Sequence, residues 1–207
     1  MAVIVPRWEW RWFGPRLGPA ESKLAAMTPV GVQESDETYL LSGAGDNVKV
    51  RDALMDIKVL REVDGNGLEQ WTPVMKAGFP LPAAEVAKVF EALRLDLPPL
   101  RRERYSLDEF ISELAVPSGR IRAVKVDKRR TRYTVGGCMA ELSEVVADGK
   151  PTRTVAVESE DAAAVVAAVR SLEMGGYLNT SYPRGLAALI EGKPSRYAVI
   201  DVGTNSV

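Results

Sequence analysis

Charged residues alternate with large apolar residues along several short segments of this chain, and this period of two constrains the fold most. The clearest segment, residues 3–13, reads VIVPRWEWRWF. Successive side chains of an extended strand point to opposite faces, so the tryptophans of this segment share one face and its charged residues share the other. The charged residues are Arg7, Glu9 and Arg11, and the aromatic ones are Trp8, Trp10 and Trp12. We therefore expect a strand with one aromatic face and one charged face.

Charge at period two recurs on further segments whose opposite faces are apolar. In an ordinary antiparallel sheet the charged face would lie in water. Alternatively, the sheet closes with helices on its outside and the charges inward, where they must pair with one another or with a ligand. Such an interior would suit a polyanion held by the basic residues and divalent cations held by the acidic ones. Periodicity alone does not choose between these readings. The further alternating positions are Lys49 and Arg51, Asp56 and Lys58, Lys125, Asp127 and Arg129, and Glu158 and Glu160.

The order of predicted elements divides the chain into two halves, each a run of strands followed by helices. Strands are predicted at 37–43, 47–53, 55–63 and 68–78, and later at 120–135, 138–146 and 152–160. Helices are predicted at 82–93, 106–114, 162–172 and 182–190. Ser106 with Glu109 forms a potential capping box, and Asp161 is a potential N-cap. This order is typical of an α+β fold with a closed or nearly closed antiparallel sheet.

Composition excludes several classes of function. The 207 residues include 27 Lys and Arg against 28 Asp and Glu, and the net charge of −1 indicates no general attraction to nucleic acid or membrane. The chain has no histidine, which excludes a His general base and a His-ligated zinc site. A single cysteine, Cys138, fits a reducing compartment. No apolar run reaches membrane-spanning length, so we expect a cytoplasmic protein.

Residues 5–191 resemble the CYTH, or triphosphate tunnel, superfamily. The resemblance rests on the opening strand, VKVR at 48–51, VKVDKRRTRY at 124–133, AELSEVVADGKPTRTVAVESED at 140–161 and NTSYPRGL at 179–186. It implies a domain at 1–192 with an eight-stranded antiparallel tunnel and flanking helices. Proteins of this superfamily bind triphosphate-containing compounds with basic residues and hold Mg²⁺ or Mn²⁺ with acidic ones.

Carried onto this chain, the resemblance implies a set of phosphate-binding residues and a set of metal ligands, while no catalytic residue is assigned. The implied phosphate-binding residues are Arg11, Lys49, Arg51, Lys58, Lys125 and Arg129. The implied metal ligands are Glu9, Glu158 and Glu160, with Glu141 as a further acidic candidate.

The first strand departs from the superfamily's E-x-E-x-K signature, because Arg7 stands in place of the first glutamate. Arg11 in place of the lysine keeps a cation for phosphate. Two like charges about 4 Å apart repel by about 4 kcal/mol at an effective dielectric constant near 20. Arg7 therefore weakens the expected Mg²⁺ or Mn²⁺ site, and phosphate binding should persist more readily than hydrolysis, which needs the metal.

The C-terminal segment 193–207 contains AVIDVGTNS, which resembles the opening strand and phosphate loop of the Ppx/GppA exopolyphosphatase domain. A Gly-led turn after a buried strand can aim backbone N–H groups at phosphate. An ordinary polar tail is the alternative interpretation. On the resemblance, we expect 193–207 to be a linker and the first part of a truncated phosphatase domain, joined in cis to the tunnel.

Three hypotheses of function follow. The leading one is a module that binds inorganic polyphosphate or a triphosphate in a basic tunnel and serves an exopolyphosphatase domain. The second is an active, metal-dependent tripolyphosphatase that tolerates Arg7. The third is a structural domain whose inner charges pair among themselves and which mediates homodimer contacts.

Overall fold

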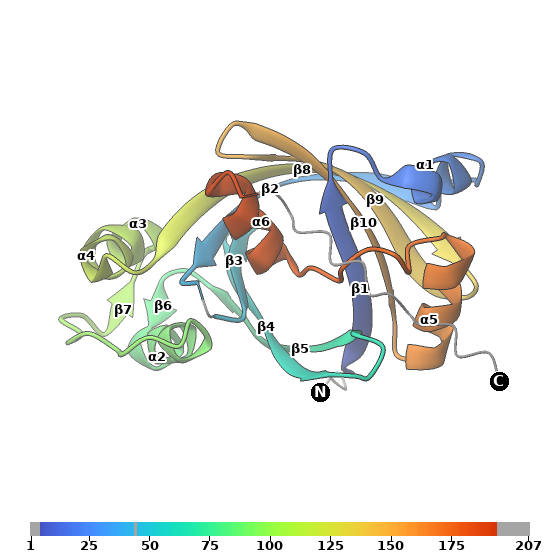
Figure 1. Ribbon diagram of the computed structural model, residues 1–207. Helices are drawn as coiled ribbons and strands as arrows, with labels where there is room; N and C mark the ends of the chain where they lie inside the picture. The colour runs from blue at the N-terminus through green and yellow to red at the C-terminus, as the bar shows by residue number, and fades with distance from the viewer. Residues whose placement is uncertain (1–4, 44, 194–207) are drawn as a thin grey trace.

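Eight antiparallel strands form a closed barrel in the computed structural model, which describes residues 5–43 and 45–193 (Figure 1). Around the barrel the strands follow the order β1-β10-β9-β8-β2-β3-β4-β5, and β5 pairs with β1 to close it. The expected eight-stranded barrel with flanking helices is confirmed. The strands are β1 (Arg7–Gly14), β2 (Gly31–Leu41), β3 (Asn47–Arg51), β4 (Leu54–Val63), β5 (Glu69–Gly78), β8 (Arg122–Val135), β9 (Cys138–Ala147) and β10 (Lys150–Ser159).

Strand β2 begins at Gly31, six residues before the predicted strand at 37–43. The added part pairs with the far half of β8, from Gly31 opposite Arg132 to Asp36 opposite Asp127. Most of its side chains are exposed. A strand segment without a buried face has no hydrophobic alternation, so the sequence pattern does not reveal it.

The tryptophan face of β1 lies under helices on the outside of the barrel. Helices α1 (Gly18–Ala25) and α5 (Ala162–Ser171) cover it, and Figure 1 shows both at the same end of the molecule. Trp10 and Trp12 are buried in one cluster with residues of both helices. Trp12 also stacks on Tyr177, with ring centroids 3.6 Å apart. Because the aromatic face is buried outside, the charged face of β1 points into the barrel.

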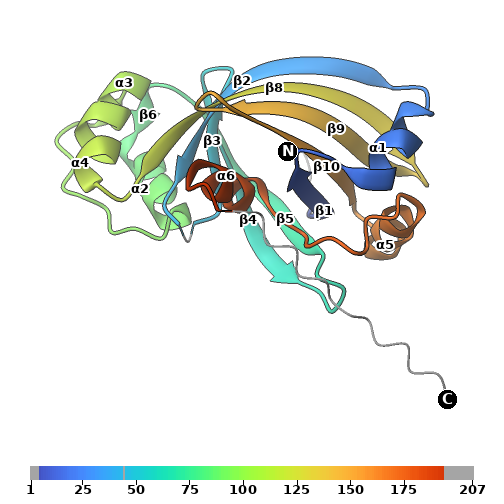
Figure 2. The same cartoon turned by 45° about the horizontal axis from the view of Figure 1, so that its top comes forward.

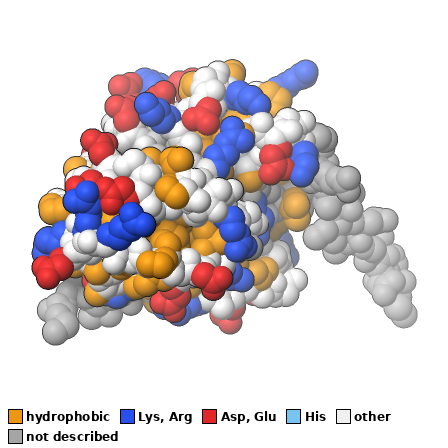
Figure 3. All heavy atoms as spheres, turned by 90° about the vertical axis from the view of Figure 1, so that its left-hand side faces the viewer, with side chains coloured by type: hydrophobic (Ala, Val, Ile, Leu, Met, Phe, Trp, Pro, Cys, Tyr) orange, Lys and Arg blue, Asp and Glu red, His pale blue; other side chains and the backbone are white. Residues whose placement is uncertain are grey.

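A separate helical lobe covers the outer faces of β3 and β4. Their valine, methionine and isoleucine side chains form one cluster with buried residues of the lobe. The capping box of Ser106 and Glu109 is present at the start of α3, as predicted. Figure 3 looks onto this side of the molecule and shows side chains of both charges around exposed hydrophobic atoms. The lobe consists of β6 (Leu81–Pro82), α2 (Ala83–Ala92), β7 (Arg104–Tyr105), α3 (Leu107–Glu109), a π-helical turn η1 (Phe110–Ala115) and α4 (Val116–Ser118).

Helix α6 (Tyr182–Ile190) packs against the inner faces of β1, β2, β8 and β9 and fills part of the barrel (Figures 1 and 2). Tyr182 meets Phe13 edge-on at 5.1 Å and stacks on Tyr39 at 5.5 Å. The barrel interior is therefore apolar where α6 lies and polar beyond it. Of the helices in the described residues, none is long and apolar enough to cross a membrane.

Candidate functional site

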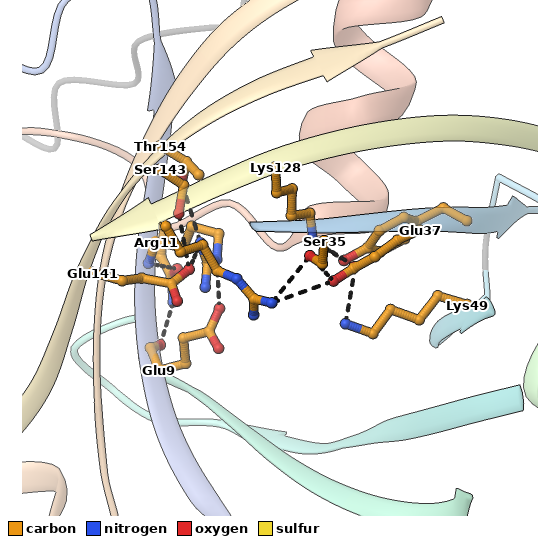
Figure 4. A network of polar contacts seen from close by, with 12 residues as sticks. Glu9, Arg11, Ser35, Glu37, Lys49, Lys128, Glu141, Ser143 and Thr154 are labelled. Carbon is orange, nitrogen blue, oxygen red and sulfur yellow. Dashed lines mark hydrogen bonds and ion pairs between the residues drawn. The ribbon is translucent and has the colours of Figure 1, made fainter. Parts of the chain in front are cut away.

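Charged side chains from every strand of the barrel point into it, Glu69 of β5 included, and Figure 4 shows part of this network. Contacts between strands far apart in sequence fix their direction: Arg11 of β1 reaches Glu141 of β9, and Lys128 of β8 reaches Glu37 of β2. The inward direction predicted by resemblance is thus found for β1, β3, β4 and β10. The inner charged residues are Arg7, Glu9, Arg11, Glu37, Lys49, Arg51, Asp56, Lys58, Glu69, Lys128, Arg130, Glu141 and Glu158.

The predicted direction of β8 is wrong. Lys125 and Arg129 lie on the outside of the barrel, and Arg129 forms an exposed ion pair with Glu34 at 3.5 Å. The physical reason is the burial of Val124 and Val126 against α6, which turns the valine face of the strand inward. Lys128 and Arg130, the next two residues after Val126 on the same face of the strand, supply the inner cations instead.

Glu37 is the centre of a cluster of four cations, two from β3 and two from β8. Its Oε2 lies 2.7 Å from Lys128 Nζ and 3.1 Å from Lys49 Nζ. Its Oε1 lies 3.7 Å from Arg130 and 3.8 Å from Arg51. The carboxyl is buried, with 3% of Glu37 exposed, so these pairs are shielded from water. We call Glu37, Lys49, Arg51, Lys128 and Arg130 the cation cluster.

Burial and pairing shift the pKa values within the cation cluster in opposite ways. Burial alone would raise the pKa of Glu37, but Lys128 and Lys49 outweigh it and hold the pKa far below its ordinary value. Burial lowers the pKa of Lys128, and repulsion from Lys49 adds to this effect while Glu37 opposes it. Burial also lowers the pKa of Lys49, against the attraction of Glu37. Glu37 is therefore ionised, and its charge favours the protonated form of both lysines.

A second polar cluster surrounds Arg11, whose guanidinium lies 2.8 Å from Glu9 and 2.9 Å from Glu141. It also donates to Thr154 Oγ1 at 3.3 Å and lies 4.3 Å from the ring centre of Tyr182. Burial would lower the pKa of Arg11, but Glu9 and Glu141 outweigh it and raise the pKa above its ordinary value. Burial opposes ionisation of Glu141 too, yet Arg11 lowers its pKa to about 2. Arg11 is thus a positive charge held between two carboxylates.

The backbone of this part of β1 is held by Asn179, in the segment before α6. Its side-chain oxygen accepts from the backbone N–H of Arg11 at 2.8 Å. Its amide donates to the carbonyl oxygens of Glu9 and Gly67, both at 2.9 Å. One buried amide therefore ties β1 to the β4–β5 turn and to the approach to α6.

The predicted metal ligands Glu9, Glu158 and Glu160 line one cavity of about 430 Å³ together with Arg7, Lys58 and Trp71. Their carboxylates do not converge, because Glu9 pairs with Arg11 and Glu158 pairs with Arg7 at 3.2 Å. Glu141 lines a neighbouring cavity of about 270 Å³. Within 5–43 and 45–193, no group of three or more His, Cys, Asp or Glu residues is arranged to hold a metal ion. This donor set does not fit a divalent cation as it stands, since arginines pair with Glu9, Glu141 and Glu158.

Several inner residues escaped the sequence analysis. Lys128 and Arg130 follow Val124 and Val126 at period two, so continuing the valine face would have found them. Glu37 shares its face with Tyr39, but the run DETYLL gives no alternation to follow. The other missed contact joins Glu69 to Arg184 of α6 across the barrel. Burial raises the pKa of Glu69, and Arg184 opposes this shift.

No protein-family model and no curated protein matches this sequence. Solved structures match the fold. A protein from Hippeastrum, named as an adenylyl cyclase and described as having a dominant triphosphatase activity, superposes with a TM-score of 0.50 at 14% identity, over 92% of this chain and 99% of its own. A Bacillus halodurans protein named as an adenylate cyclase superposes with a TM-score of 0.47 at 9% identity, over 86% of this chain and 96% of its own. A conserved hypothetical protein from Pyrococcus furiosus superposes with a TM-score of 0.42 at 16% identity, over 82% of this chain and 90% of its own. At these identities the likeness concerns the fold alone.

Proposed function

We propose that the barrel binds compounds that carry a chain of phosphate groups, such as tripolyphosphate or longer inorganic polyphosphate. The observation that carries the proposal is the charge balance of the cation cluster, in which four cations face Glu37. Even when Asp52 and Asp56, 3.7 and 4.0 Å from Arg51, are counted with Glu37 as carboxylates, the four cations exceed the three carboxylates by one. Excess positive charge in a partly buried site favours an anionic ligand with several charges.

The exposure of the four cations suggests how such an anion would meet them. The side chain of Arg51 is 22% exposed and that of Lys49 is 12% exposed. Those of Arg130 and Lys128 are 9% and 2% exposed. Arg51 is therefore the cation that an entering phosphate reaches most easily, and its guanidinium suits bidentate contact with phosphate oxygens.

Binding in this proposal does not need a divalent cation. Arg7 pairs with Glu158, and Arg11 pairs with both Glu9 and Glu141, three of the four carboxylates that the resemblance implies as metal ligands. Because these three carboxylates have guanidinium partners, a metal ion would have to displace an arginine before it could bind any of them.

Isothermal titration of tripolyphosphate in the presence of a chelator tests the proposal. We expect wild-type protein to bind, with an affinity that falls as salt concentration rises. Arg51→Ala should weaken binding about tenfold, which corresponds to about 1.4 kcal/mol. Arg129→Ala is the matched control, since Arg129 lies on the outside of the barrel. Absence of binding by the wild-type protein, or equal losses in the two variants, would contradict the proposal.

Metal-dependent hydrolysis of tripolyphosphate is the second candidate, favoured by the common cavity that Glu9, Glu158 and Glu160 line. It predicts release of phosphate with Mn²⁺ that Glu158→Gln abolishes. A purely structural role predicts neither binding nor release. The proposed link to an exopolyphosphatase domain rests on residues that lie outside the described part of the chain.

A further inference from the structure

Glu37 is a carboxylate in the middle of the site to which we assign phosphate binding. All four cations of the cluster lie within 4 Å of its two oxygens. None of its side chain is exposed, and Figure 4 shows it between Lys49 and Lys128. A buried glutamate in contact with so many cations occupies the place that a bound anion would take.

The two oxygens of Glu37 are contacted much as the oxygens of a bound anion would be. Lys128 and Lys49 donate to Oε2, at 2.7 and 3.1 Å. Ser35 donates to Oε1 at 3.1 Å, and the guanidinium of Arg130 donates in turn to that hydroxyl. The carboxylate thus supplies internally the negative charge that keeps these buried cations together.

Hydrogen-bonding capacity remains open beside the cluster. The Nε of Arg130 is buried and has no hydrogen-bond partner among the described residues. The hydroxyl of Tyr182 is also buried and has no hydrogen-bond partner among the described residues. The centre of the Tyr182 ring lies 3.7 Å from Lys128 Nζ. A buried donor without a partner is costly, so these two groups are available to a ligand that reaches the cluster.

We propose that Glu37 is the resident counter-ion of the tunnel and sets its affinity for phosphate. It stabilises the empty barrel by neutralising the cation cluster, and it weakens ligand binding because its charge repels the incoming anion. This inference rests on the proposed function, since it assigns Glu37 a role in the same site. It predicts that removal of the charge has opposite effects on the stability of the free protein and on its affinity.

The test compares wild-type protein with Glu37→Gln by titration with tripolyphosphate in a chelator and by thermal unfolding without ligand. We expect Glu37→Gln to bind about tenfold more tightly or better and to melt at a lower temperature when free. Glu34→Gln is the matched control, because Glu34 lies on the same strand with its side chain 76% exposed. A merely structural role of Glu37 would lower the melting temperature without tightening binding.

The outcomes show whether the inference, the proposed function or both have failed. If the wild type binds and Glu37→Gln binds equally or more weakly, the inference is overturned while the proposed function stands. If only Glu37→Gln binds, Glu37 blocks the wild-type site, which supports the inference against the proposed function. If neither binds, both are overturned. Should Glu37→Gln not fold, Glu37→Asp keeps the charge but withdraws it from the cations, and unchanged affinity in that variant overturns the inference.

Discussion

Glu141→Gln provides a quantitative test of the ion pairs inside the barrel. Arg11 holds the pKa of Glu141 at about 2, against an ordinary value of 4.5. Each tenfold change in acidity corresponds to about 1.4 kcal/mol, so the ionised carboxyl contributes about 3 kcal/mol to stability at neutral pH. The side chain is only 20% exposed, so solvent screens this contribution weakly. Breaking one partner of a buried pair typically costs about 3–5 kcal/mol, which agrees with this magnitude.

The sign of the pH dependence follows from the lowered pKa. A carboxyl with a depressed pKa in the folded state stabilises the protein above pH 4.5 and loses this contribution as pH falls toward 2. Wild type and Glu141→Gln should therefore differ by about 3 kcal/mol at pH 7 and by about 1 kcal/mol at pH 3. Urea denaturation at both pH values measures the difference.

Glu144→Gln is the control for this experiment, because Glu144 lies on the same strand but is exposed on the outer face. Its effect should stay within about 0.5 kcal/mol at both pH values. A difference between wild type and Glu141→Gln that does not shrink in acid would refute the assignment of the stabilisation to the Arg11 pair.

Three further predictions concern α6, β1 and the lysines of the cation cluster. In Gly185→Ala the new Cβ would lie 2.6 Å from the ring of Phe13, so we expect a loss of about 1–3 kcal/mol in urea denaturation; unchanged stability would show that α6 moves freely. Asn179→Ala removes hydrogen bonds to one buried and two partly buried backbone groups and should cost about 3 kcal/mol, and a cost below 1 kcal/mol would contradict this role. Burial lowers the pKa values of Lys49 and Lys128, so both should lose their protons at a lower pH than an ordinary lysine, and tripolyphosphate affinity should fall with them. Calorimetric titration at a series of alkaline pH values tests this prediction. An affinity that does not change over this pH range would argue against lysine contacts.

Alternation identified a charged face on four strands, and the resemblance to triphosphate tunnels predicted that these faces line a closed barrel. In β1, tryptophans alternate with charges, and burial of the aromatic face under α1 and α5 leaves one direction for the charges. In β8 the alternation of Lys125, Asp127 and Arg129 pointed to the wrong face, and Lys128 and Arg130 place charge on the opposite face of the same strand. The choice between its faces depends on contacts with α6, some 60 residues later, which no local pattern contains.

The sequence pattern also could not predict which inner charges pair with one another. Arg11 reaches Glu141 across 130 positions of the chain, and Lys128 reaches Glu37 across 91. Charge periodicity indicates which side chains share a face of one strand, but closure of the barrel decides which strands meet across it. The resemblance therefore named Glu9 and Glu158 as acidic residues of the interior, whereas their pairing with arginines is visible only in the structure.

A crystal structure with tripolyphosphate, grown in the presence of a chelator, tests metal-independent binding in the tunnel most directly. We predict phosphate oxygens within hydrogen-bond distance of Arg51 and Lys49 inside the barrel, with no metal ion between phosphate and the carboxylates. Tripolyphosphate bound only on the outer surface near Lys125 and Arg129, or bound inside only when Mn²⁺ is added, would contradict the proposed function.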